Sequence, residues 1–405
     1  MPRIDRDRLI GDLTSLRGFG TYETGVHRPT FSAEDVAARH WFAGRLEEAG
    51  LDVTIDGIGN ILGKSRKPGL AMLTGSHLES QNRAGWLDGA LGCVYGLEAV
   101  RALAEDPATA ERAVDVVVLC DEEGHYGSFL GSRSFIGILD ESEIDAAANR
   151  YHGKPLRQAL DEAGLAGQPR LTVEPERYRG FIEAHIEQGD RLEAAGLKIA
   201  AVTAIVAIWQ YKITVEGEQN HAGTTGMARR RDAGLGLTRL LAAVDRAFPE
   251  VAGPASVWTT GRITLEPGAP SIIPGRAEAL FQFRDADPAV LDRLDATLRR
   301  LVAEAGAGPC PVRLDVLGQS RPALMDEGLL GAIEAAAAMH AKGLAARMPS
   351  GAGHDAQYLA RVMPAAMLFV PSIGGISHHW TENTSDDDLA LGAQVYAEAV
   401  AKALA

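Results

Sequence analysis

Four short apolar runs, each with histidine or acidic residues within it or just after it, constrain the fold of this chain most strongly. They are LAML (70–73), VDVVVLC (114–120), GFIEAHIEQG (180–189) and AAMLFV (365–370). The second and fourth have the length and largely apolar character of strands buried on both faces of a parallel or mixed sheet. Helical stretches such as 89–105 and 325–342 lie between the runs. This alternation predicts an α/β architecture.

The composition is that of a globular protein with a sizeable core, since 46% of the 405 residues are apolar. The formal net charge is −14 with Lys and Arg scattered, whereas nucleic-acid binders usually carry a basic patch. Cys93, Cys120 and Cys310 form no CxxC pair, which argues for a reducing compartment. The first residues lack the apolar core of a signal peptide, and no apolar run is long enough to span a bilayer. We therefore expect a cytoplasmic protein without nucleic-acid or membrane partners.

Residues 208–321 follow a different pattern from the rest of the chain. The predicted elements are strand (QYKITVEG), helix (RRDAGLGLTRLLAAVDRAF), strand (SVWTTGRITL), strand (RAEALFQFRD), helix (PAVLDRLDATLRRLVAEAG) and strand (VRLDVLG). This βαββαβ order is the split pattern of a ferredoxin-like sandwich. We predict a small α+β domain at 208–321, inserted into a larger domain that is formed by residues 1–207 and 322–405.

Residues able to bind metal gather at the apolar runs. The histidines and acids in or just after the runs are His77, Asp88, Glu122, Glu123, His185 and His378. In open α/β sheets, ligands bind beyond the carboxyl ends of the strands. Imidazole and carboxylate together suit Zn²⁺, Mn²⁺, Co²⁺ or Ni²⁺. A two-metal site needs a bridging carboxylate, terminal His or Glu ligands and one free carboxylate as base, and this inventory meets that need.

Each of these residues also has a purely structural interpretation. A lone histidine after a strand is commonly a capping or core residue. The adjacent acids Glu122 and Glu123 could form a solvated turn, and Asp88 before Gly89 could cap the next helix. Their joint occurrence at the ends of several predicted strands favours a metal site.

Longer motifs support the same interpretation. They are GSHLES with LDGALG, DEEG with SFLGSR, HIEQG with LEAAGL, NHAGTT with RRDA, IIPGR with FRD, SGAGHDA, and GGISHHWTE. In this order, from about residue 34 to about residue 398, they resemble the amidase/hydantoinase/carbamoylase branch of the dinuclear metallopeptidase superfamily. That branch includes N-carbamoyl-L-amino acid amidohydrolase, allantoate amidohydrolase, ureidoglycolate amidohydrolase and β-ureidopropionase. The resemblance implies a zinc-exopeptidase-like catalytic domain, with a mixed sheet flanked by helices, and an inserted ferredoxin-like lid and dimerisation domain.

The resemblance also implies a role for each metal-site residue and two divalent ions per subunit. His77 and His185 resemble ligands of the first metal, Glu123 and His378 ligands of the second, and Asp88 the bridging carboxylate. Glu122 resembles the general base, which would take a proton from a hydroxide held between the metals and pass it to the leaving nitrogen.

Further residues resemble substrate-binding groups of the family. His221, in NHAGTT, resembles a histidine that stabilises the tetrahedral oxyanion, often across a dimer interface, which implies a homodimer here. Arg284 resembles the group that binds the substrate carboxylate, although an ion pair with Asp285 or Asp287 is its structural alternative. For His221 the alternative is a turn residue. Residues with a weaker resemblance to substrate contacts are Gln81, Gln188, Ser271 and His354, the last beside Asp355 in SGAGHDA.

The chain departs from its relatives at several positions near these motifs. Glu79 replaces the usual Asp, and we expect its longer arm to hold His77 through the second ring nitrogen. Ser271 replaces an Asn that contacts substrate. His125 and Tyr126 follow the Glu-Glu-Gly turn, where Ser-Arg-Phe is common in relatives. Trp86 lies where a Gly- and Lys/Arg-rich stretch is usual. We expect the departures to alter the substrate and to leave the ligands intact.

The function that these patterns favour is metal-dependent hydrolysis of the C–N bond of an N-carbamoyl (ureido) amino acid or related ureido acid, a small molecule that carries a carboxylate. An aminoacylase or dipeptidase of the same superfamily is the alternative enzyme. A catalytically silent small-molecule binder is a distant alternative, because such a protein would lack the base or a ligand, and neither loss is visible.

Overall fold

The computed structural model describes residues 1–405 and divides the chain into two compact units. Unit 1 comprises Met1–Thr203 and Leu324–Ala405, and unit 2 comprises Ala204–Ala323. These boundaries differ by a few residues from the junctions at 208 and 322 that the sequence suggested. The stretch from Ile199 to Trp209 contains apolar residues almost throughout and no turn signal, so the local sequence does not mark the boundary.

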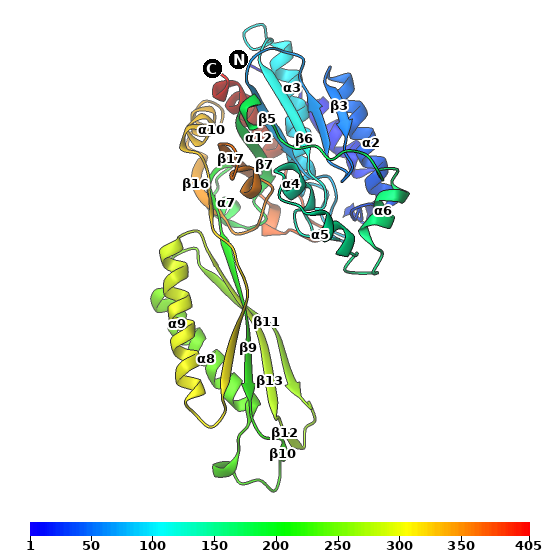
Figure 1. Ribbon diagram of the computed structural model, residues 1–405. Coiled ribbons are helices and arrows are strands. Elements are labelled where there is room, and N and C mark those ends of the chain that lie inside the picture. Colours follow the sequence, from blue (N-terminus) through cyan, green and yellow to red (C-terminus); the bar gives the residue numbers. More distant parts are fainter. The chain divides into compact units, whose positions relative to one another are not determined.

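Unit 1 contains a nine-stranded sheet with the order β15–β8–β17–β7–β5–β6–β4–β3, and β16 pairs with β8 (Figure 1). The strands are β3 (Asp52–Ile55), β4 (Ile61–Lys64), β5 (Ala71–Ser76), β6 (Ala113–Val118), β7 (Tyr178–Ile186), β8 (Ile199–Ile205), β15 (Ala323–Leu324), β16 (Ala345–Ser350) and β17 (Ala365–Val370), and a separate small hairpin contains β1 (Thr21–Tyr22) and β2 (Gly25–Val26). The central strands β17, β7, β5 and β6 are parallel. The flanking pairs β8–β17, β4–β6 and β3–β4 are antiparallel. The predicted mixed α/β sheet is confirmed.

The central strands form the core of unit 1. Every residue of β5, β6 and β17 is buried, and β6 contains four valines, whose branched side chains suit a pleated sheet. The helices are α1 (Arg6–Arg17), α2 (Ala33–Glu48), α3 (Ala90–Glu105), α4 (Leu130–Phe135), α5 (Glu141–Ala146), α6 (Leu156–Glu162), α7 (Arg191–Ala194), α10 (Glu327–His340), α11 (Ala356–Leu359) and α12 (Asp386–Ala403), with 3₁₀ turns at η1 (Pro175–Arg177) and η3 (Ile373–Gly375). Helix α3 packs against β5, β6 and β7, and α10 and α12 pack against β17. No helix is both long and apolar enough to cross a bilayer.

Helix α2 illustrates how the local sequence sets helix ends. The Ser32 hydroxyl accepts the N–H of Asp35 at 3.2 Å, as an N-cap residue does, and the acids of the first turn oppose the helix dipole. Beyond the other end, Gly50 has a φ of +86°, a conformation that glycine adopts without strain. Helix α2 therefore occupies the stretch between these two signals, from Ala33 to Glu48.

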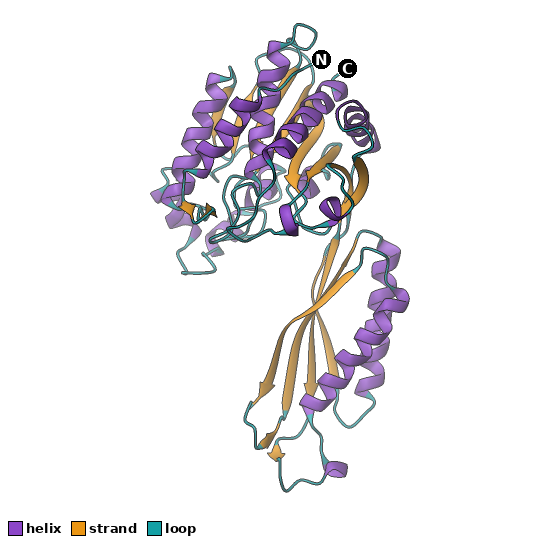
Figure 2. Cartoon of the chain, turned by 180° about the vertical axis from the view of Figure 1, so that it is seen from behind, coloured by secondary structure: helices purple, strands orange, loops and turns teal.

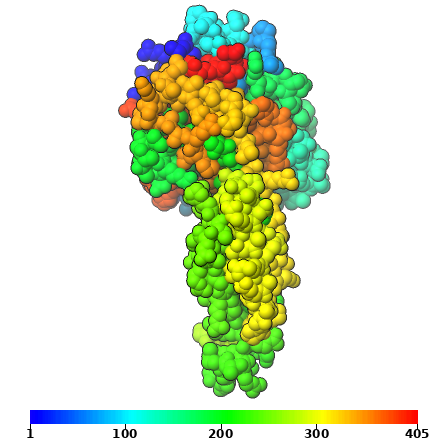
Figure 3. Space-filling model, turned by 90° about the vertical axis from the view of Figure 1, so that its left-hand side faces the viewer, coloured from blue at the N-terminus to red at the C-terminus, as the bar shows by residue number.

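Unit 2 contains a four-stranded antiparallel sheet in the order β11–β13–β9–β14. Its elements are β9 (Ala207–Glu216), β10 (Asn220–His221), η2 (Met227–Arg229), α8 (Ala233–Val251), β11 (Val257–Glu266), β12 (Ile272–Ile273), β13 (Arg276–Asp285), α9 (Pro288–Gly306) and β14 (Val312–Gln319). Helices α8 and α9 lie side by side on one face of the sheet (Figures 2 and 3). Alternate residues of β13, such as Phe281 and Phe283, are buried under them, whereas Gln282 and Arg284 point to the other face. The predicted βαββαβ order is present, and the short strands β10 and β12 were not predicted.

A glycine inside β5 provides a test of how tightly the central strands pack. Gly75 has a φ of +133°, and a Cβ at this position would lie 1.8 Å from the carbonyl oxygen of Val117 in β6. We expect Gly75→Ala to lower the free energy of unfolding by about 3 kcal/mol or more, measured by urea denaturation. The control is Gly331→Ala on the exposed side of α10, where nothing obstructs a methyl group and we expect a gain of about 0.5–1 kcal/mol. Equal stabilities of the two variants would contradict this account.

Candidate metal centre

The carboxyl ends of the parallel strands bring the predicted ligands together. His77 directly follows β5, and His185 is the next-to-last residue of β7. The turn that carries Glu123 follows β6, and the loop that carries His378 follows β17. Asp88 precedes the start of α3. Parallel strands end at the same edge of a sheet, so residues that are far apart in the sequence become neighbours here.

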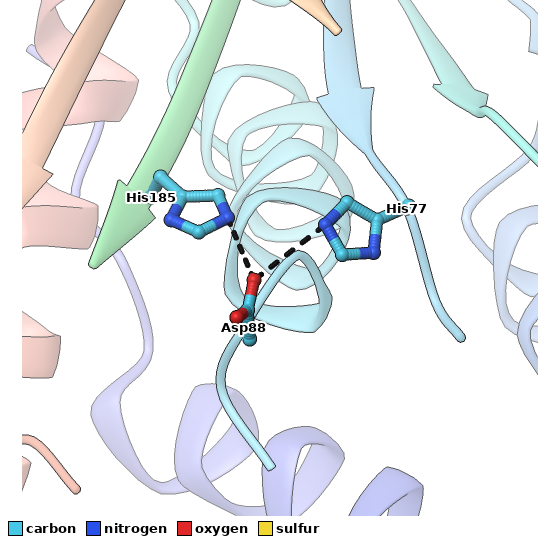
Figure 4. Close-up of side chains that lie close together, drawn as sticks. All are labelled: His77, Asp88 and His185. Atoms are coloured by element: carbon cyan, nitrogen blue, oxygen red, sulfur yellow. Dashed lines mark ion pairs between the residues drawn. The ribbon is translucent and has the colours of Figure 1, made fainter. Parts of the chain in front are cut away.

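His77, Asp88 and His185 form a first ligand group, in which the ligand atoms lie within 4.8 Å of one another and all three residues are buried. Asp88 Oδ1 is 3.1 Å from His185 Nε2 and 3.6 Å from His77 Nε2 (Figure 4). Nδ1 of His77 faces the carbonyl oxygen of Glu79 at 3.0 Å, and Nδ1 of His185 faces that of Ile186 at 2.9 Å. A carbonyl oxygen only accepts, so each Nδ1 carries a proton and Nε2 is the atom available to a metal.

Asp88, Glu123 and His378 form a second ligand group. His378 Nε2 lies 3.3 Å from Asp88 Oδ2 and 3.7 Å from Glu123 Oε2. The side chain of His378 is 52% exposed, so this group opens to the surface whereas the first does not. Asp88 belongs to both groups and contributes one oxygen to each. A carboxylate shared in this way can bridge two cations.

The pKa values of the histidines show where the site favours positive charge and where it does not. Burial lowers the pKa of His77 to about 4. Burial also acts against protonated His185, but its hydrogen bond to Asp88 raises the pKa to about 9, and the bond to Asp88 likewise raises that of His378 to about 9. Although burial acts to raise the pKa of Asp88, hydrogen bonds to these two histidines hold it well below its usual range. Asp88 therefore stabilises positive charge at His185 and His378, and the same negative charge would attract divalent cations.

The acids beside Asp88 repel one another. Burial and the nearby Asp88 raise the pKa of Glu123 to about 8, and burial and Glu123 raise the pKa of Glu122 well above its usual range. Glu122 belongs to neither ligand group, and its Oε2 lies 3.8 Å from His77 Nε2. Divalent cations would relieve this repulsion. Two groups of three donors, a shared carboxylate and excess negative charge together fit two divalent cations.

The turn that carries Glu122 and Glu123 is organised by the residue before it. Asp121 adopts a positive φ of 58°, and its carboxylate accepts the N–H groups of His125, Tyr126 and Gly127 at 2.7, 3.0 and 2.8 Å. His125 and Tyr126, where the sequence departs from its relatives, contribute main-chain N–H donors to this turn. Asp121 thereby fixes the chain just after the two acids, and both lie close enough to Asp88 for its charge to raise their pKa.

Two glutamines that were predicted to contact substrate donate hydrogen bonds to the candidate metal-binding acids. Gln81 donates from its main-chain N to Glu123 Oε1 at 3.1 Å and from its side-chain amide to Oε2 at 2.8 Å. Gln188 donates to Asp88 Oδ2 at 2.9 Å, and its buried Oε1 has no hydrogen-bond partner. Gln188 therefore keeps one acceptor available, whereas the amide of Gln81 is committed to a ligand.

Glu382 supports Asp88, a contact that sequence reasoning missed. Its carboxylate accepts the N–H of Asp88 at 3.1 Å, the N–H of Leu87 at 3.3 Å and the hydroxyl of Ser377 at 3.0 Å. It thereby ties the Asp88 loop to the loop that carries His378. The only signal in the sequence was its position at the end of GGISHHWTE.

His354 lies behind the first ligand group. It is 2% exposed, its ring centroid is 4.6 Å from that of His185, and its Nε2 lies 2.8 Å from the hydroxyl of Ser350. The adjacent Asp355 is fully buried and accepts a hydrogen bond from Ser132. The His354 ring thus packs against His185, and the polar groups of His354 and Asp355 bond to serine hydroxyls.

Glu79 does not hold His77 in the predicted way. Its carboxylate is 3.9 Å from His77 Nδ1, which faces the main-chain oxygen of Glu79 instead. The longer side chain extends past His77 and reaches Arg39 and the main-chain N of Glu122.

His221, Ser271 and Arg284 lie in unit 2. His221 in β10 pairs with Ile272 in β12, and the carbonyl of Ser271 accepts the N–H of the residue after His221 at 2.9 Å. Arg284 lies near the end of β13, where it pairs with Ile208 of β9, and burial lowers its pKa. His221 and Ser271 are therefore neighbours at one end of the sheet, and Arg284 lies at the other.

This fold, with potential ligands at the carboxyl edge of its parallel strands, defines the class of protein. The chain belongs to peptidase family M20/M25/M40, whose sequence profile matches residues 73–402.

Two named enzymes and one solved structure are similar to the chain over nearly its whole length. The chain is 33% identical to the N-carbamoyl-L-amino acid amidohydrolase of Geobacillus stearothermophilus, over 97% of each chain. It is 32% identical to the ureidoglycolate hydrolase of Oryza sativa subsp. japonica, over 98% of this chain and 85% of the relative. Among solved structures, an amidase of the hydantoinase/carbamoylase family from Burkholderia phymatum aligns with a TM-score of 0.95 and 47% identity, over 100% of this chain and 98% of that one.

The sharing of Asp88 leads to a testable pattern of metal content. We expect Asp88→Asn to lose both ions, whereas His185→Ala and His378→Ala each lose one, as measured by mass spectrometry of metal content after dialysis. A bound ion at one hundred times its Kd would raise the free energy of unfolding by about 2.7 kcal/mol, and chelator would remove that gain. His40→Ala, an exposed change on α2, is the control. Full metal content in Asp88→Asn would refute the shared-ligand arrangement.

Proposed function

We propose that this protein is a metal-dependent amidohydrolase that cleaves the C–N bond of an N-carbamoyl amino acid or a related ureido acid. The observation that carries the proposal is the pair of ligand groups that share Asp88, beside a third carboxyl, Glu122, that belongs to neither. Similarity to N-carbamoyl-L-amino acid amidohydrolase and ureidoglycolate hydrolase supports a ureido substrate. The three cysteines are free and buried, which agrees with the cytoplasm as the location.

We assign His77, His185 and Asp88 to one divalent cation, and Glu123, His378 and Asp88 to another. Mixed imidazole and carboxylate ligands suit Zn²⁺, Mn²⁺, Co²⁺ or Ni²⁺. When bound, the two cations supply Lewis acidity, which lowers the pKa of an attacking water and polarises the substrate carbonyl.

Glu122 is the general base in this proposal. Its side chain is only 10% exposed, and burial together with the charge of Glu123 raises its pKa, which makes the carboxylate a stronger base. It takes a proton from the attacking water and delivers it to the leaving nitrogen. With a ureido acid, the ureido carbon is released as carbon dioxide together with ammonia, and the amine remains on the acid.

His221 is the proposed donor to the oxyanion. Its Nδ1 accepts the main-chain N–H groups of Gly223 at 3.0 Å and Thr224 at 3.3 Å. An Nδ1 that accepts hydrogen bonds bears no proton, so in the neutral ring the hydrogen is on Nε2. The NHAGTT loop thus presents an exposed N–H donor of the kind that stabilises a developing negative charge.

The separation of His221 from Arg284 favours a homodimer. Arg284 lies near one end of β13, and His221 lies in β10, beyond the other end of that strand. β13 is about 30 Å long at roughly 3.3 Å per residue. Arg284 pairs with Ile208 in β9, and we assign it to the carboxylate of the substrate. His221 would then serve the partner's site, with Ser271 beside it.

Strand β11 is a candidate dimer contact. It lies at the edge of the unit 2 sheet, and Val257, Ile263 and Leu265 are 51%, 55% and 41% exposed on it. An exposed apolar edge strand is a template for pairing with another chain, and a second copy of unit 2 would cover it.

Substrate assays test the proposed reaction. We expect the enzyme, stripped by chelator and reloaded with Mn²⁺, Zn²⁺, Co²⁺ or Ni²⁺, to release ammonia from one or more ureido acids. Glu122→Gln should lower kcat by about 100-fold or more while both ions stay bound. Cleavage of N-acyl amino acids alone would replace the ureido substrate with an acyl one, and no turnover despite two bound ions would favour the silent binder.

Complementation between two inactive variants tests the shared dimer site. Glu122→Gln and His221→Ala are co-expressed with different tags. If His221 acts across the dimer, each mixed dimer contains one intact site, and we expect about a quarter of wild-type activity from random pairing. If His221 acts within its own subunit, no site is intact, and activity stays at the level of the single variants.

A further inference from the structure

Arg39 of α2 is a charged side chain at the centre of unit 1, only 3% exposed. Its guanidinium donates to Asp35 Oδ2 at 3.0 Å, to the carbonyl oxygen of Gly59 at 2.8 Å and to Glu79 Oε2 at 2.6 Å. A buried guanidinium is tolerated when its donors are met in this way. The guanidinium is therefore held in one orientation, in which Nη2 donates to Glu79.

Glu79 joins this guanidinium to the turn that carries the proposed base. The side chain is fully buried, and while Oε2 accepts from Arg39, Oε1 accepts the main-chain N–H of Glu122 at 2.7 Å. One carboxylate thus spans from α2 to the turn after β6. The same carboxylate is 3.9 Å from His77 Nδ1, whose hydrogen-bond partner is a main-chain oxygen.

The hydrogen bonds of the turn show why this link matters. Asp121 accepts the N–H groups of residues 125–127, which lie after the two acids. Glu79 holds the N–H of Glu122 itself. The Glu79 carboxylate therefore helps to set the position of the Glu122 backbone, including the Cα atom from which its side chain extends.

We infer that Arg39 and Glu79 form a brace that positions Glu122, and that they act as positioning residues for proton transfer. The inference rests on the proposed role of Glu122 as base. Side-chain length is essential to it, because an aspartate would withdraw the carboxylate by about one carbon–carbon bond, roughly 1.5 Å. A glutamine would keep the length but could not accept from both Arg39 and Glu122, since only one of its two terminal atoms is an acceptor.

The test compares Glu79→Asp, Glu79→Gln and Arg39→Lys in the full-length, metal-loaded protein. The matched control is Asp12→Asn, because Asp12 is also a buried acid, 5% exposed, which accepts from Arg45 at 2.9 Å and Arg101 at 2.6 Å on a different part of unit 1. We expect kcat to fall by about 100-fold in the Glu79 variants, with KM within about twofold and two ions retained, as displacement of a reacting group by about 1 Å predicts. Asp12→Asn should keep the wild-type kcat.

A second measurement needs no substrate, so it separates failure of the brace from failure of the proposed function. Hydrogen–deuterium exchange of the peptide over residues 119–124 reports on the Glu122 N–H. We expect this amide to exchange at least about tenfold faster in both Glu79 variants and at the wild-type rate in Asp12→Asn. Unchanged exchange in Glu79→Asp would overturn the inference, as would loss of one metal ion in parallel with activity, which would show that the carboxylate acts through His77.

Discussion

The position of one carboxylate, Asp88, between His185 and His378 is the interaction on which the candidate site depends. Its two oxygens lie 3.1 and 3.3 Å from the two imidazoles, so the groups that the structure gathers from β7 and from the loop after β17 meet at a single side chain. Asp88 precedes α3, which packs against three strands of the sheet, and its main-chain N–H donates to Glu382 at 3.1 Å. A rigid bridging anion sets the separation of any two cations that bind.

Concentrating so many acids in the interior requires compensation, and the structure supplies it with main-chain N–H groups and amides. Glu382 accepts two main-chain N–H groups, and the amides of Gln81 and Gln188 donate to Glu123 and Asp88. These donors orient the acids without neutralising them, so the negative charge stays available to cations. Arg39, the buried cation beside the site, is paired with Asp35 and Glu79, which lie behind the ligands. The same pairing explains why the Glu79 side chain extends away from His77.

Unit 2 presents its two functional candidates at opposite ends of one sheet. Arg284 belongs to the end near the connection to unit 1, and His221 belongs to the end where β10 and β12 pair. A compact reaction centre cannot include two groups that are the length of β13 apart in the same rigid unit. A proposal that uses both therefore needs two copies of the chain, and the exposed apolar edge of β11 offers a surface on which they could meet.

The sequence by itself predicted the main elements and the candidate ligands of the site. The apolar runs at 114–120 and 365–370 predicted buried strands because their pattern is local, and the histidines and acids beside them predicted metal binding because strand ends converge in any parallel sheet. Only the tertiary structure decided which groups each side chain meets. Glu79 contacts Arg39 and Glu122 rather than the ring of His77, and Glu382 supports Asp88 from almost 300 residues further along the chain. Such contacts depend on how the fold brings together segments that are remote in the sequence, which no local periodicity encodes.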